Sequence, residues 1–263
     1  MSATISSEAI GARFAALRAK GRRALVPYVT AGHPDRAASV ALLQGLASAG
    51  ADVIEVGVPF SDPLADGPVI QASSQRALAL GTTFDTVLEI IAEAAVPVPI
   101  VLFSYLNPLL AAGSDALSRA AEAGAHGVLV TDLPVGADPE RERWLGESAL
   151  AFIRLVAPTT PRERMREIAT HGSGFVYLIS RLGVTGVRDE LPPELPETVA
   201  RLREVTTLPI AVGFGVATPE QAASVARLAD GVVVGSAIVR AAEQGVDAAV
   251  RFAASLRASI DAA

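Results

Sequence analysis

Three acidic side chains stand close together in the segment EVGVPFSDPLADGP, which runs from Glu55 to Pro68: Glu55, Asp62 and Asp66. The segment contains three prolines and no basic residue, so it is too interrupted to form a helix. A carboxyl group without a neighbouring cation is suited to proton transfer when it is buried. The segment is therefore the first candidate for chemistry, with turn capping as the ordinary alternative for each aspartate.

Glycines gather at two places in the C-terminal quarter of the chain. GFG (Gly213–Gly215) and GSA (Gly235–Ala237) each follow an apolar run. Glycine lets backbone N–H groups approach an anion closely, and a helix N-terminus adds its dipole. The two motifs together predict a phosphate site, which would reconcile an acidic protein with an anionic substrate.

A third candidate is the long segment RLGVTGVRDELPPELP (Arg181–Pro196), with two early glycines and three late prolines. Its length and composition are typical of a lid over a site, and a surface loop is the alternative.

Short apolar runs alternate with longer amphipathic runs along the chain. The predicted strands are Ala24–Thr30, Asp52–Gly57, Pro99–Ser104, Gly127–Asp132, Ala151–Val156, Phe175–Ser180, Pro209–Phe214 and Gly231–Ser236. Strands that alternate with helices favour a parallel sheet covered by helices, and eight such strands close a barrel. An open doubly wound sheet is the main competitor, but its usual glycine-rich first turn is missing from YVTAGHPD.

A barrel would place Glu55 in a definite position. Period-two alternation puts Val53, Glu55 and Gly57 on one face of their strand and Ile54 and Val56 on the other. The first face is expected to point into the barrel, near the carboxyl end where such enzymes keep their chemistry. Burial should raise the pKa of Glu55 and suit it to proton transfer near neutral pH. A bond to backbone or to a distant arginine is the structural alternative.

Composition excludes several classes of function. The chain has 263 residues, of which 51% are apolar, and a single barrel domain over residues 1–263 fits this length. The net charge is −6 without a basic run, which argues against nucleic acid as a partner. The sequence has no cysteine, so disulfides and thiolate chemistry are excluded. We expect neither a membrane helix nor a signal peptide, and therefore a cytoplasmic protein.

Helix-start signals appear at several places. Ile10, Phe14 and Leu17 recur at helical spacing and predict an N-terminal amphipathic helix packed on the domain. Thr160 and Thr218 are each followed by proline and, at the third position, by glutamate or glutamine. Both are expected to form a capping box with proline as the first helical residue.

Several motifs resemble the family of tryptophan synthase α subunits: EVGVPFSDPLADGPVIQ, RLGVTGVR, PIAVGFGV, VVVGSAIV, VPYVTAGHPD, SYLNP and TDLP. The resemblance runs from about Leu25 to the C-terminal helix, and the first motif is the most specific. It implies a (β/α)8 TIM barrel with an extra N-terminal helix and a short phosphate-binding helix after strand 8. It also implies a retro-aldol lyase that cleaves indole-3-glycerol phosphate to indole and glyceraldehyde 3-phosphate, without a metal or a cofactor of its own.

The resemblance also implies roles for individual residues. Glu55 would transfer protons, and Asp66 would hold the indole N–H and stabilise the positive charge on the ring. Thr185 would meet Asp66 when the lid closes. The phosphate would contact the backbone N–H groups of Gly186, Gly215, Gly235 and Ser236. The wall of the indole pocket would consist of Tyr28, Phe103, Tyr105, Thr131, Tyr177 and Phe214.

A partner subunit follows from the same resemblance. In the family the loop after strand 2 and the SYLNP and TDLP segments face a β subunit, which condenses indole with serine using pyridoxal phosphate. The resemblance therefore implies that this chain would form an α2β2 heterotetramer. The matching interface candidates are Pro59, Asp62, Asn107 and Pro134.

Three other functions are compatible with parts of the pattern. A stand-alone lyase that releases free indole would keep all the motifs. Another phosphate-sugar barrel enzyme would share the glycine sites but would not need PFSDPLADGP. A non-catalytic regulatory subunit would tolerate the loss of Glu55 or Asp66, and both are present.

Overall fold

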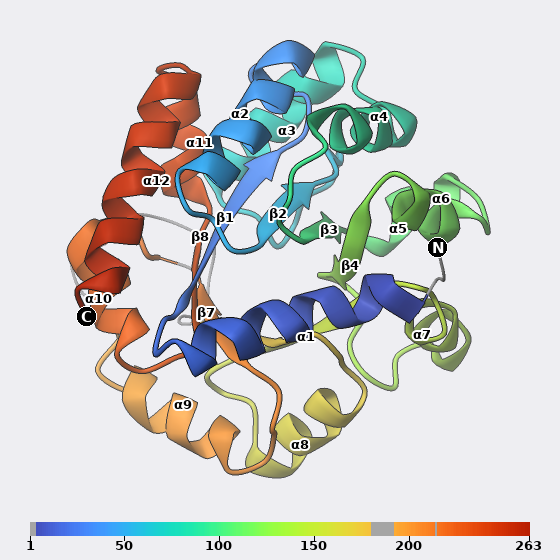
Figure 1. Cartoon of the computed structure of the whole chain (residues 1–263). Helices are drawn as coiled ribbons and strands as arrows, with labels where there is room; N and C mark the ends of the chain where they lie inside the picture. The colour runs from blue at the N-terminus through green and yellow to red at the C-terminus, as the bar shows by residue number, and fades with distance from the viewer. Residues whose placement is uncertain (1–3, 180–191, 214) are drawn as a thin grey trace.

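The computed structural model describes residues 4–179, 192–213 and 215–263. Within these residues eight parallel strands form a closed barrel in sequence order, and the first strand pairs with the eighth (Figure 1). The predicted (β/α)8 barrel is confirmed, and the open sheet is excluded because it would leave two strand edges unpaired. That residues 1–263 form one domain stays a prediction.

The strands lie close to their predicted positions: β1 Ala24–Thr30, β2 Ile54–Gly57, β3 Ile100–Ser104, β4 Ala125–Val130, β5 Ala151–Val156, β6 Val176–Ile179, β7 Ile210–Gly213 and β8 Gly231–Val234. The helices are α1 Thr4–Ala19, α2 Arg36–Ser48, α3 Pro68–Ala79, α4 Phe84–Ala94, α5 Leu106–Ala111, α6 Ala116–Glu122, α7 Pro139–Gly146, α8 Arg162–Thr170, α9 Leu195–Arg203, α10 Pro219–Ala226, α11 Ser236–Ala242 and α12 Val246–Asp261. The main difference is β4, which starts and ends two residues earlier than predicted. None of these helices, within the described ranges, is long and apolar enough to cross a membrane.

Alternation along the strands separates two hydrophobic clusters. Ile54 and Val56 belong to the outer cluster, which lies between the barrel and its helices. Val53 and Val101 belong to the inner cluster, which fills the barrel interior. The predicted faces of β2 are therefore confirmed, and Glu55 lies on the inner side.

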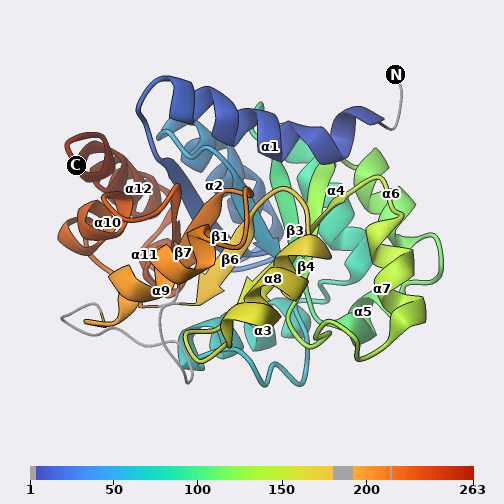
Figure 2. The same cartoon turned by 90° about the horizontal axis from the view of Figure 1, so that it is seen from below.

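Helix α1 covers the amino-terminal end of the barrel, as the two perpendicular views show (Figures 1 and 2). Its residues Ile10, Phe14 and Leu17 are buried in the inner cluster, which confirms the predicted amphipathic helix. The absence of a side chain at Gly127 makes this packing possible, because a Cβ there would lie 2.7 Å from the Ile10 side chain. Access to the interior is thereby confined to the carboxyl end of the strands.

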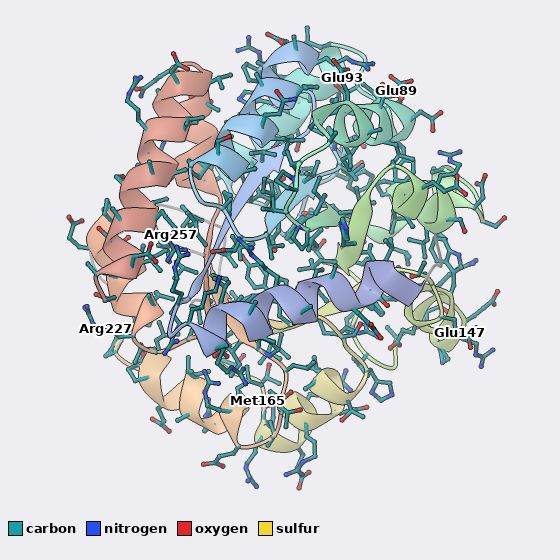
Figure 3. All side chains as sticks on the ribbon, in the orientation of Figure 1. Glu89, Glu93, Glu147, Met165, Arg227 and Arg257 are labelled. Atoms are coloured by element: carbon teal, nitrogen blue, oxygen red, sulfur yellow. The ribbon has the colours of Figure 1, made fainter. Side chains whose placement is uncertain are left out.

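A buried carboxylate ties α1 and α12 to the barrel. Asp52 contacts Arg13 of α1 at 2.7 Å and Arg257 of α12 at 3.0 Å, and it accepts the Leu25 N–H at 3.0 Å. Figure 3 labels Arg257 beside α12. Two cations and one amide satisfy this buried charge, so both helices are attached to the amino-terminal end of the barrel.

The two predicted capping boxes have different outcomes. Thr218 accepts from the Gln221 N–H and the Gln221 side chain returns the bond, so this box is confirmed. The box at Thr160 is wrong: α8 begins at Arg162, after Pro161, and has no side-chain cap. The Thr160 hydroxyl instead accepts the Ala157 N–H at 3.1 Å, so it closes the preceding turn.

Thr218→Ala is expected to lower the free energy of unfolding by about 1 kcal/mol, the usual cost of losing a cap. Ser224→Ala in the same helix is the matched control, because its hydroxyl donates to the Glu220 carbonyl and accepts from the exposed Arg227 side chain, and neither bond caps the helix. Urea unfolding of both variants measures the difference. An equal effect of the two substitutions would contradict the capping role.

Candidate active site

A pocket opens at the carboxyl end of the strands. It brings together eight of the predicted site residues: Tyr28, Glu55, Asp66, Phe103, Tyr177, Gly215, Gly235 and Ser236. Their elements are β1, β2, β3, β6 and the segments that follow β2, β7 and β8. One cavity therefore contains two carboxyl groups, three aromatic rings and a glycine-rich wall.

Glu55 is buried in the barrel interior with only 1% of its surface exposed. Its Oε1 atom has no hydrogen-bond partner among the described residues. Burial raises the pKa of Glu55 from its ordinary value of 4.5 to about 8. At neutral pH the carboxyl group is therefore mostly protonated and can donate a proton to a molecule in the pocket.

Asp66 lies at the end of the loop that follows β2 and, unlike Glu55 Oε1, its carboxylate has a hydrogen-bond partner. The Tyr105 hydroxyl donates to Asp66 Oδ2 at 2.9 Å. Burial raises the pKa of Asp66 from 3.8 to about 6, and the Tyr105 bond opposes part of this rise. Asp66 is therefore mostly ionised at neutral pH, while Glu55 stays protonated. Two carboxyl groups in different states can perform different tasks in one reaction.

Two glycines make room for two tyrosine hydroxyls in the pocket. A Cβ at Gly57 would lie 2.1 Å from the Tyr28 hydroxyl, and a Cβ at Gly213 would lie 2.2 Å from the Tyr177 hydroxyl. The Tyr28 ring also meets Phe103 edge-on, with ring centroids 5.2 Å apart. The result is an aromatic wall that suits a flat, apolar ring.

The glycine-rich wall lies around the start of α11. Gly235 precedes the helix and Ser236 is its first residue, so their N–H groups have no partner within the helix. Gly215 has φ of +95°, a conformation that favours glycine. This wall places backbone donors at the same cavity as the carboxyl groups.

Two residues predicted to line the indole pocket lie outside its lining. Tyr105 is buried, and its phenol hydroxyl donates a hydrogen bond to Asp66. Thr131 is half-buried in a neighbouring hollow, and its hydroxyl donates to the Ser104 carbonyl at 3.4 Å. A substrate-binding role for these two residues stays a prediction.

The predicted partner residues lie on the face where the pocket opens. Asp62, Asn107 and Pro134 are exposed there. Pro59 is buried, although it lines a surface hollow together with Asn107. Its ring therefore offers a partner less area than the other three residues do.

Three predicted residues, Thr185, Gly186 and Phe214, lie outside the described residues. The same is true of most of the predicted lid, from Arg181 to Leu191. Their roles stay predictions.

The sequence reasoning missed five lining residues: Ile70, Val216, Ala217, Val233 and Ala237. Val233 could have been found, because it shares the inward face of β8 with Gly231. The others lie in helix starts and loops, where no periodic signal exists. Among the described residues no three His, Asp or Glu side chains are grouped to bind a metal.

Comparison with known proteins identifies the family. The family described as tryptophan synthase alpha chain matches residues 14–262. A tryptophan synthase alpha chain of Gluconacetobacter diazotrophicus is 48% identical over 91% of this chain and 89% of its own length. That of Geobacter sulfurreducens is 46% identical over 95% of this chain and 98% of its own.

Solved structures agree with this result. Mycobacterium tuberculosis tryptophan synthase superposes with a TM-score of 0.88 at 38% identity, over 95% of this chain and 97% of that one. The Legionella pneumophila alpha subunit superposes with a TM-score of 0.87 at 37% identity, over 97% and 98% of the two chains. Both the sequence and the fold therefore show that this chain belongs to the tryptophan synthase alpha chain family, a family of carbon–carbon lyases.

Proposed function

We propose that Glu55 and Asp66 carry out the reaction of this family, the cleavage of indole-3-glycerol phosphate in tryptophan biosynthesis. The observation that supports this assignment is the pair of carboxyl groups in one pocket, with pKa values of about 8 and about 6. One of them is protonated and the other is ionised at neutral pH, as an acid and a cation stabiliser must be.

The reaction needs two proton transfers, one from Glu55 to the substrate and one from the substrate back to Glu55. Protonated Glu55 donates to carbon 3 of the indole ring, which places a positive charge on the ring nitrogen. The bond from carbon 3 to the glycerol chain then breaks, and its electron pair returns to the ring. The glycerol hydroxyl loses its proton as it becomes the aldehyde, and the Glu55 carboxylate accepts that proton. The products are indole and glyceraldehyde 3-phosphate, and Glu55 returns to its starting state.

The remaining residues of the pocket bind the two ends of the substrate. Ionised Asp66 accepts the indole N–H and stabilises the charge on the ring nitrogen. The rings of Tyr28, Phe103 and Tyr177 contact the indole. The phosphate binds at the backbone N–H groups of Gly215, Gly235 and Ser236. In this arrangement the chain uses no metal and no cofactor of its own.

Membership of the family implies a β-subunit partner. The finer points are part of the proposal: an α2β2 heterotetramer, pyridoxal phosphate on the β subunit alone, and a cytoplasmic location. Indole is small and apolar and would be lost if it were released to solvent. The exposed residues Asp62, Asn107 and Pro134 lie on the face where the pocket opens, so a partner bound there can receive indole directly.

The test is indole release from indole-3-glycerol phosphate by the purified chain, alone and with a β subunit, after dialysis against a chelator. Slow release alone and faster release in the complex is expected. Full activity of the isolated chain would favour the stand-alone lyase. No cleavage in either case would favour a regulatory subunit or an enzyme acting on another sugar phosphate.

Asp62→Ala is expected to lose most of the activation by the β subunit while the slow basal rate stays unchanged. Asp62 is exposed, and Asp66 follows it after one short turn in which the Asp66 N–H donates to Pro63 O. A partner that contacts Asp62 can therefore order the turn that carries Asp66. We expect the β subunit to raise the wild-type rate at least ~10-fold, a coupling of about 1.4 kcal/mol.

Indole release across a β-subunit titration measures this coupling in both proteins. Glu147→Ala, which removes an exposed carboxylate at the C-terminal end of α7, controls for the loss of a charge. Normal activation of Asp62→Ala would show that the turn does not transmit docking.

A further inference from the structure

Tyr105 stands immediately after β3, as the residue that precedes α5. It is 4% exposed, and its hydroxyl makes two hydrogen bonds to the loop that follows β2. It accepts the Ala65 N–H at 2.9 Å and donates to Asp66 Oδ2 at 2.9 Å. One phenol thus holds a backbone amide and the neighbouring carboxylate at the same time.

The direction of both bonds is fixed by chemistry. A backbone N–H can only donate, so the phenol oxygen must accept from Ala65. Its single proton is then available to Asp66, which must accept it. A carboxylate accepts such a bond better than a protonated carboxyl group does, so the arrangement favours ionised Asp66.

Tyr105 is itself held in place from several sides. The Phe60 ring lies against it, with ring centroids 5.2 Å apart. The N–H of the next residue, Leu106, donates to Asp132 Oδ1 at 2.8 Å. The segment that carries Tyr105 is thereby fixed to the loop that follows β4, and Asp66 is attached to a rigid support.

We infer that Tyr105 is a positioning residue, which fixes Asp66 and the backbone before it to the segment that follows β3. This inference rests on the proposed role of Asp66 and assigns to Tyr105 a task other than lining the indole pocket. Tyr105 acts on the substrate only through Asp66.

The bond from Tyr105 also affects the pH at which Asp66 titrates. The groups that face Asp66 are the phenols of Tyr28, Tyr105 and Tyr177 and the carboxyl group of Glu55. Each phenol has a pKa raised by burial, and the pKa of Glu55 is about 8, so Asp66 is the group among them that titrates near pH 6. The Tyr105 bond lowers the pKa of Asp66, so its loss must raise that pKa further.

Tyr105→Phe is the test, because it keeps the ring against Phe60 and removes only the hydroxyl. The acid limb of the pH profile of kcat/KM for indole release should move to higher pH. At pH 6 we expect kcat/KM to fall roughly 10-fold, the lower end for losing a bond to a charged group. At pH 8, where Asp66 is ionised in both proteins, the loss should shrink below about 3-fold.

Tyr28→Phe is the matched control, because its hydroxyl lies 3.4 Å from Thr30 and makes no bond to Asp66. It removes a phenol from the same pocket and should leave the acid limb in place. Indole binding by calorimetry at the same two pH values gives a readout without turnover, and the Tyr105→Phe defect should again be larger at pH 6.

An equal loss at both pH values, or the same shift in Tyr28→Phe, would overturn the inference. A wild-type chain that fails to cleave the substrate would instead refute the proposed function, so the two failures are distinguishable.

Discussion

Glu55→Gln is expected to lower the rate of indole release by at least about 100-fold, the lower end for removing a general acid–base group. The amide has the shape of the carboxyl group, but it cannot donate a proton to carbon 3 and then accept one from the glycerol hydroxyl. Binding of the substrate should change little, so the loss should be in kcat rather than in KM.

Steady-state assays of the variant, alone and with the β subunit, measure this loss. Glu147→Gln is the control, because it makes the same chemical change at an exposed position on the outer surface (Figure 3). Near-normal turnover by folded Glu55→Gln would refute the assignment of the proton-transfer group.

The same substitution should also change the pH dependence of stability. An unfolded chain ionises Glu55 near pH 4.5, whereas the folded chain keeps it protonated up to a pKa of about 8. Between these values the folded state binds more protons than the unfolded state, so the wild type loses stability as pH rises. The Tm advantage of Glu55→Gln should therefore grow from pH 4.5 to pH 8 and level off above. Thermal melts at several pH values would show this, and a constant difference would contradict the burial of an acid.

The inward orientation of Glu55 could be predicted from the sequence because strand alternation is a local property. The two opposite faces of β2 differ in composition, and the structure confirms which one points into the barrel. The positions of Gly235 and Ser236 could also be predicted from the sequence, because a strand end followed by a helix start fixes the backbone there.

Other features depend on contacts between distant parts of the chain. The bond between Tyr105 and Asp66 joins positions 39 residues apart, and no spacing rule predicts it. The Thr160 hydroxyl accepts the N–H of Ala157, which precedes it, and so closes a turn. The Thr218 hydroxyl, in the same four-residue pattern, accepts the N–H of Gln221, which follows it, and so caps a helix. Such choices are made by tertiary packing.

The second large effect is expected from a substitution in the glycine-rich wall, where the phosphate is proposed to bind. Gly235→Leu should raise the Kd for glycerol phosphate by at least about 100-fold, because two hydrogen bonds to a charged group, each worth about 1.5–3 kcal/mol, would be blocked. A Cβ at Gly235 meets no close atom, since it would lie 3.7 Å from the Tyr28 Cβ, and φ there is −101°, outside the left-handed region. The rest of a leucine must then occupy space in the pocket where the phosphate is proposed to bind.

In the proposed arrangement indole binds at the other end of the pocket, so its affinity in Gly235→Leu should stay within a few fold of wild type. Calorimetry with glycerol phosphate and with indole measures the two ends separately, and this comparison distinguishes a local block from a general disturbance. Gly11→Leu is the control, because it adds the same side chain to α1, where a Cβ meets nothing within 4 Å. Unchanged affinity for glycerol phosphate in Gly235→Leu would show that the anion binds elsewhere, and the backbone N–H groups around α11 would then have no part in substrate binding. Loss of both affinities would instead show that the leucine deforms the aromatic wall through Tyr28.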